Sequence, residues 1–133
     1  AARAAEFGID PRRMVLGGWS AGGRIAAYAA YADGVPCVGV LSLSGLMQVE
    51  DIATHVAPGR PQPPLLMVLA EEDIDYLREA GAAMVQALRE RGCDARLVGV
   101  PARDHWYAAE AMTDAGVPLQ QAVRAALRDW TGV

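Results

Sequence analysis

The segment Gly18-Trp19-Ser20-Ala21-Gly22 constrains the fold of this chain more than any other part of it. An apolar run from Met14 to Leu16 precedes the segment, and a stretch of small residues from Gly23 to Tyr31 follows it. This order predicts a strand, a tight turn at the serine and then a helix, which is the sequence form of a nucleophile elbow. We expect glycine on both sides of the turn because a side chain at either position would collide with the neighbouring strand or helix.

Apolar runs alternate with helical patterns along the rest of the chain. The first strand, Met14 to Gly18, and the runs Cys37 to Leu46 and Leu65 to Ala70 lack polar alternation, which is typical of parallel strands covered on both faces. A fourth strand is predicted at Ala95 to Val100. Helices are predicted over Ala21 to Ala32, Tyr76 to Arg91 and from Pro118 onward. The fold class is therefore α/β, with three α/β/α layers around a mostly parallel sheet.

Size and charge restrict the partners. The 133 residues, 53% hydrophobic and 21% charged, are typical of one soluble globular domain spanning residues 1–133. A net charge of -4 without a basic cluster argues against binding to nucleic acid. No apolar run approaches the roughly 20 residues that cross a bilayer. We expect neither a nucleic-acid partner nor a membrane span.

The residue inventory excludes several chemistries. All twelve basic residues are arginine, which excludes a lysine Schiff base and a Ser-Lys dyad, and the lack of asparagine excludes a Cys-His-Asn triad. The two histidines, His55 and His105, cannot form a three-histidine zinc site. Cys37 and Cys93 lie far apart and read as buried thiols. We expect no metal and no cofactor, and the remaining chemistry is that of serine, histidine and carboxylate.

The candidate site residues each follow a predicted strand directly. They are Ser20, the acidic cluster Glu71-Glu72-Asp73 and His105. Chemistry in α/β sheets gathers beyond the carboxyl ends of the strands, so we expect these side chains at one edge of the sheet. Each also has a structural alternative: a plain tight turn for Ser20, a cap of the helix near Tyr76 for the acids, and an exposed loop position for His105.

Three segments resemble the α/β-hydrolase superfamily, particularly its carboxylesterase and lipase-like members. Asp10 to Gly23 resembles the nucleophile segment, Leu65 to Asp73 the strand and acid turn, and Val98 to His105 the histidine segment. The chain order Ser, Asp, His also matches. The resemblance covers nearly the whole chain and implies a partial α/β-hydrolase fold, the C-terminal half of the sheet, in a domain that is N-terminally incomplete. Targeting signals would lie in the missing part, so the location stays open, with the cytoplasm favoured.

The resemblance implies a serine hydrolase that cleaves carboxylic esters through an acyl-enzyme intermediate. Its triad would be Ser20, Asp73 and His105, with Asp73 preferred over Glu72 and Asp75. The family's oxyanion hole would use the N–H of Ala21 and a second donor from an earlier glycine-rich loop that this sequence lacks, so we expect the chain alone to be weakly active or inactive. Trp19, Trp106 and Tyr107 are expected beside the site, as a wall for an acyl or aryl group or as core packing.

Two other functions stay open at this stage. One is an amidase or peptidase of the same superfamily, and the other is a noncatalytic α/β domain or an inactive fragment.

The sequence departs from the common family pattern at Trp19, where histidine is frequent, and at Ala70, where glycine is frequent. Neither Trp19 nor Ala70 is expected to touch the reacting groups. The expected partner is a small-molecule ester, and the oligomeric state is left open.

Overall fold

The structure is a computed structural model that describes residues 3–108 and 118–132. Within these residues, four parallel strands form the centre of the molecule. The sheet order is β1-β2-β3-β4. All neighbours pair in parallel, with Leu16 opposite Val40 and Leu66 opposite Arg96. The carboxyl ends of the strands therefore share one edge of the sheet. The strands are β1 (Val15–Trp19), β2 (Gly39–Leu43), β3 (Leu65–Ala70) and β4 (Ala95–Val100).

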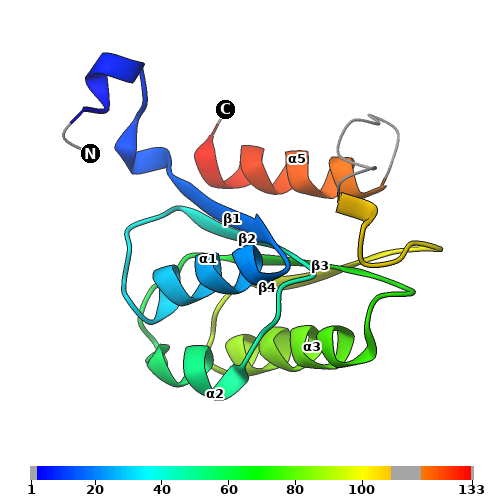
Figure 1. Cartoon of the computed structure of the whole chain (residues 1–133). Helices are drawn as coiled ribbons and strands as arrows, with labels where there is room; N and C mark the ends of the chain where they lie inside the picture. Colours follow the sequence, from blue (N-terminus) through cyan, green and yellow to red (C-terminus); the bar gives the residue numbers. More distant parts are fainter. Residues whose placement is uncertain (1–2, 109–117, 133) are drawn as a thin grey trace.

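Helices cover both faces of the sheet (Figure 1). One face carries α1 (Ala21–Tyr31), the short α2 (Val49–Ile52) and α3 (Asp75–Glu90), and the other carries α5 (Pro118–Thr131). The predicted three-layer α/β/α arrangement is thus confirmed. Short 3-10 turns lie at η1 (Ala5–Phe7), η2 (Pro11–Arg13) and η3 (Ala53–His55).

Each face of the sheet has its own hydrophobic core. Every residue of β3 is buried. The consecutive β3 residues Leu65 and Leu66 belong to different hydrophobic clusters, because successive side chains of a strand point to opposite faces of the sheet. Burial on both faces explains the continuous apolar runs. The first core joins the sheet to α1 and α3 through Ala27, Met67, Met84 and Leu88, and the second joins it to α5 through Val68, Tyr107, Leu119 and Val123.

The second strand is shorter than the apolar run Cys37 to Leu46. It begins at Gly39 and ends at Leu43, because Ser44 leaves the extended conformation with a φ of 47°. Near the N-terminus, Ala5–Phe7 form a single 3-10 turn. Gly8 closes this turn, with a φ of 63° and its N–H donating to the carbonyl of Ala5.

Candidate active site

Ser20 occupies the sharp turn between β1 and α1. Its φ of 53° and ψ of -122° are uncommon for a residue other than glycine. Backbone contacts hold this conformation: the Ser20 N–H donates to Leu43 O at 2.8 Å, and the Ser20 carbonyl accepts from Gly23 N at 3.0 Å. The turn therefore fixes the serine hydroxyl at the carboxyl edge of the sheet.

The glycines around the turn are not equally required. A Cβ on Gly18 would lie 2.4 Å from the backbone carbon of Gly22, as expected. The expectation for Gly22 was wrong, because a Cβ there would meet nothing within 4 Å. Gly23 is the crowded helix position instead, where a Cβ would lie 2.5 Å from Ser42 Oγ. Close approach of helix to strand thus depends on Gly18 and Gly23.

The side chain of His105 contacts both Ser20 and Asp73. Its Nε2 lies 3.1 Å from Ser20 Oγ, and its Nδ1 lies 2.8 Å from Asp73 Oδ1. One neutral tautomer satisfies both contacts, because an ionised carboxylate only accepts: Nδ1–H donates to Asp73 and Nε2 accepts from the serine hydroxyl. The Asp73 side chain is fully buried, and the His105 side chain is 13% exposed. A hydroxyl, an imidazole and a carboxylate thus form one connected chain.

Of the three candidate acids, Asp73 is the one in contact with His105. Glu72 is exposed, and Asp75 accepts from Arg78 Nη2 at 2.5 Å. Asp73 Oδ1 also accepts from the N–H of Ile74 at 2.9 Å. Its second oxygen, Oδ2, accepts from the hydroxyl of Ser44. The carboxylate therefore has hydrogen-bond donors on both oxygens.

Sequence reasoning missed Ser44, and of the two alternatives for Tyr107 the structure shows core packing. Ser44 follows an apolar strand and has no local motif, because its partner Asp73 lies 29 residues away. Tyr107 is fully buried in the second core, so it forms no wall of a substrate site. Its hydroxyl donates to Val68 O at 3.2 Å and lies 3.3 Å from Ser44 Oγ. Burial, with the nearby Asp73 carboxylate, raises the pKa of Tyr107 to about 12 despite the opposing contact with Ser44.

The two tryptophans lie beside the imidazole. The indole N–H of Trp19 donates to the carbonyl of His105 at 3.0 Å, which ties the histidine loop to the end of β1. The ring centroids of Trp19 and His105 are 5.2 Å apart, and those of Trp106 and His105 are 5.8 Å apart. Trp106 is 60% exposed, so an apolar surface borders the imidazole on the solvent side.

Ala21 is the first residue of α1, directly after the serine turn. The first N–H groups of a helix have no partner within it and lie at its positive end, so they suit a negatively charged oxygen. No cluster of three or more metal-ligating side chains occurs within residues 3–108 and 118–132. Over the same residues, no helix combines the length and apolar character of a bilayer-crossing segment.

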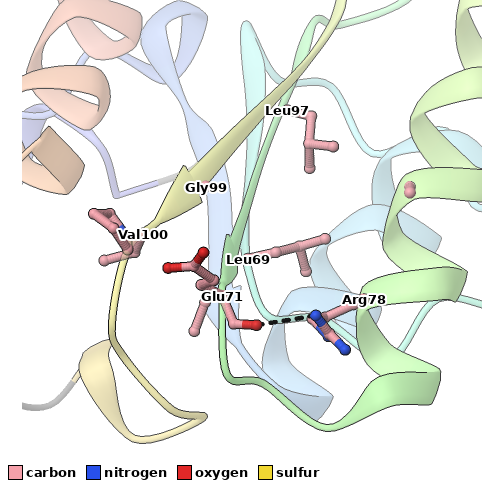
Figure 2. A pocket seen from close by; sticks show the side chains of 9 residues that line it. Leu69, Glu71, Arg78, Leu97, Gly99 and Val100 are labelled. Atoms are coloured by element: carbon pink, nitrogen blue, oxygen red, sulfur yellow. Dashed lines mark hydrogen bonds between the residues drawn. The ribbon is translucent and has the colours of Figure 1, made fainter.

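An open hollow of about 450 Å³ lies away from these groups, between β4 and α3 (Figure 2). Apolar residues such as Leu69 and Leu97 line most of it. Arg78 closes one side, where its Nη1 donates to the carbonyl of Glu71 at 3.0 Å. The lining contains neither Ser20 nor His105.

No family model matches the chain. It is 32% identical over 103 residues to a protein named acyl-protein thioesterase 1 from Gibberella zeae, an alignment that covers 75% of this chain and 44% of that protein. A truncated carbohydrate esterase from gut microbiota superposes with a TM-score of 0.81 at 13% identity, covering 99% of this chain and 64% of that one. A bacterial heroin esterase gives 0.73 at 22%, with coverages of 98% and 55%. The chain thus spans about half the length of the proteins it matches.

Proposed function

Because the chain has the α/β-hydrolase fold, we propose that it carries the nucleophile, base and acid of a serine hydrolase that cleaves carboxylic esters. The observation behind this proposal is the unbroken contact from Ser20 through His105 to Asp73. Esterases and a thioesterase among the similar proteins support the same reaction class. The three groups have the order and spacing that acyl transfer to a serine needs.

In the first step, an electron pair of Ser20 Oγ forms a bond to the ester carbonyl carbon. The hydroxyl proton moves to Nε2 of His105, and the carbonyl π pair moves onto its oxygen. The resulting imidazolium faces the buried Asp73 carboxylate, which stabilises the positive charge and fixes the ring. Asp73 itself stays ionised.

In the second step, the oxyanion pair re-forms the carbonyl and the bond to the leaving oxygen breaks. His105 Nε2 returns its proton to that oxygen, so the alcohol leaves neutral and the acyl group stays on Ser20. Water then attacks the acyl carbon and gives a proton to His105 Nε2. As the carbonyl re-forms, the bond between the acyl carbon and Ser20 Oγ breaks, and Nε2 returns the proton to Oγ. The products are a carboxylic acid and the free serine.

The Ala21 N–H is the proposed oxyanion donor. Loss of one such donor costs roughly 2.7 to 4 kcal/mol of transition-state stabilisation. The sequence offers no glycine-rich loop for a second donor, so we expect slow turnover from these residues by themselves.

The substrate class has a second candidate, a thioester. The thioesterase name of the relative at 32% identity favours it, and the same acyl-enzyme steps apply with a thiol as leaving group. Trp19 and Trp106 are proposed to contact the acyl or aryl part, since their rings border the imidazole. Matched oxygen ester, thioester and amide substrates with one acyl group would separate an esterase from a thioesterase and an amidase.

Labelling with a fluorophosphonate tests the proposed nucleophile. We expect the mass of the phosphonyl group on Ser20, detected by peptide mass spectrometry, and loss of this adduct in Ser20→Ala and His105→Ala. His55→Ala is the matched control, because His55 is the other histidine and lies exposed in η3. A folded gene product that contains this chain and stays unlabelled would instead favour the noncatalytic alternative.

A further inference from the structure

Ser44 lies directly after β2, next to the acid of the proposed triad. Its hydroxyl donates to Oδ2 of Asp73, the carboxylate oxygen that does not face His105. Ser44 and the Asp73 side chain are both fully buried. At this depth an unpaired carboxylate oxygen is costly, so the Ser44 donor has a strong effect on how the carboxylate lies.

The backbone of Ser44 indicates that its side chain is needed. Its φ of 47° lies in the left-handed region, which glycine adopts without steric cost. The Ser44 N–H donates to Val68 O at 2.8 Å, which fixes the backbone against β3. Glycine would suit this conformation better but would remove the donor to Asp73. A strained residue beside a reactive cluster is a pattern associated with function.

Burial alone does not explain the contact. Ser42 lies two residues earlier and is equally buried, yet its hydroxyl has no hydrogen-bond partner among the described residues. It packs against the backbone near Gly23 and Gly45. Ser42 therefore shares the residue type and the burial of Ser44 without the link to Asp73.

We infer that Ser44 is a positioning residue, which holds the Asp73 carboxylate so that Oδ1 faces His105 Nδ1. The inference rests on the proposed function, because it assigns Ser44 a role in the same triad. Without the Ser44 hydroxyl, both oxygens of Asp73 compete for the remaining hydrogen-bond donors, so the carboxylate rotates. The imidazole of His105 then loses its fixed orientation toward Ser20. Ser44 itself touches neither the substrate nor the reacting atoms.

The test compares Ser44→Gly and Ser44→Ala with the control Ser42→Ala. Ser44→Gly removes the hydroxyl and relieves the backbone strain, so it keeps the fold even where Ser44→Ala does not. For both Ser44 variants we expect labelling of Ser20 by a fluorophosphonate to slow by about 10- to 100-fold. With an ester substrate, kcat should fall and KM should stay unchanged. Ser42→Ala should keep the wild-type labelling rate.

A proton NMR measurement reports the positioning without any turnover. The hydrogen-bonded Nδ1 proton of His105 should give a low-field resonance in the wild type and in Ser42→Ala, and should be lost in Ser44→Gly. A wild-type spectrum without this resonance, a Ser44→Gly protein that keeps it, or an equal loss in Ser42→Ala would each overturn the inference. If Ser20 is never labelled, the proposed function fails, while the resonance still decides the role of Ser44.

Discussion

At the scale of single residues, residues with strained backbone conformations lie close to the proposed reaction site. Ser20 and Ser44 both have a positive φ, and both contact a member of the proposed triad. Ala102, the third such residue among those described that are not glycine, lies three positions before His105. These conformations are uncommon for residues with a Cβ and persist where the surrounding structure holds them.

The two glycines of the motif should respond oppositely to alanine. Gly18→Ala places a Cβ 2.4 Å from the backbone of Gly22, so we expect a loss of about 3 kcal/mol or more in the free energy of unfolding. Gly22→Ala adds a Cβ in open space within a helix, so the unfolding free energy should stay or rise by up to about 1 kcal/mol. Urea titration measures both. Equal destabilisation of the two variants would contradict the geometry described here.

The sequence could predict the site residues that follow strands but not their partners. The sequence predicted one shared edge of the sheet for Ser20, His105 and the acidic cluster, because each of them directly follows a strand. It could not separate Asp73 from Glu72 on physical grounds, because the choice depends on a contact with His105 that is 32 residues away. Ser44 gave no signal, since its hydroxyl meets Asp73 only after β2 and β3 have paired.

At the scale of elements, β3, β4 and α3 were predicted most closely. The predicted bounds of β3 and β4 are confirmed, and α3 differs by one residue at each end. The short helix α2 was not predicted, because four residues are too few to show helical periodicity. Element ends set by a single backbone angle, as at Ser44, leave no hydrophobic signature.

The docking of α5 on the sheet depends on one glycine of β2. A Cβ on Gly39 would lie 2.1 Å from the indole ring of Trp130, so Gly39→Ala should push this helix end away. We expect a loss of about 1 to 3 kcal/mol in unfolding free energy. Gly99→Ala is the matched control, because a Cβ on that strand residue meets nothing within 4 Å.

A double-mutant cycle assigns this cost to the ring. In a Trp130→Ala background, Gly39→Ala should cost less by roughly 0.5 to 3 kcal/mol, because the clash has been removed. Additive effects in urea titration would mean that the glycine acts through something other than the indole.

At the scale of the whole molecule, buried tyrosines couple stability to alkaline pH. Burial raises the pKa of Tyr107 to about 12, whereas an unfolded tyrosine titrates near ~10. The unfolded chain therefore releases this proton first. The resulting stability is fully present below pH ~10 and is lost as pH rises toward ~12. Burial also raises the pKa of Tyr31, which adds to the same trend.

Tyr107→Phe should flatten this alkaline loss. A shift of about two pKa units corresponds to roughly 3 kcal/mol, so the variant should lose that much less unfolding free energy than the wild type between pH ~10 and ~12. Urea titrations across this interval give the difference, with Tyr76→Phe, at an exposed position, as the control. Parallel curves for wild type and Tyr107→Phe would show that the phenol ionises equally in both states.

The distance of 85 positions between Ser20 and His105 along the chain has a consequence during synthesis. The ribosome releases the serine long before the imidazole that is proposed to activate it, and the three crossovers between β1 and β4 must be completed before the two meet. Until then the hydroxyl is an ordinary alcohol with negligible nucleophilicity at neutral pH. The proposed reactivity would thus be acquired in a single late event, and a polypeptide that ends before His105 would have none of it.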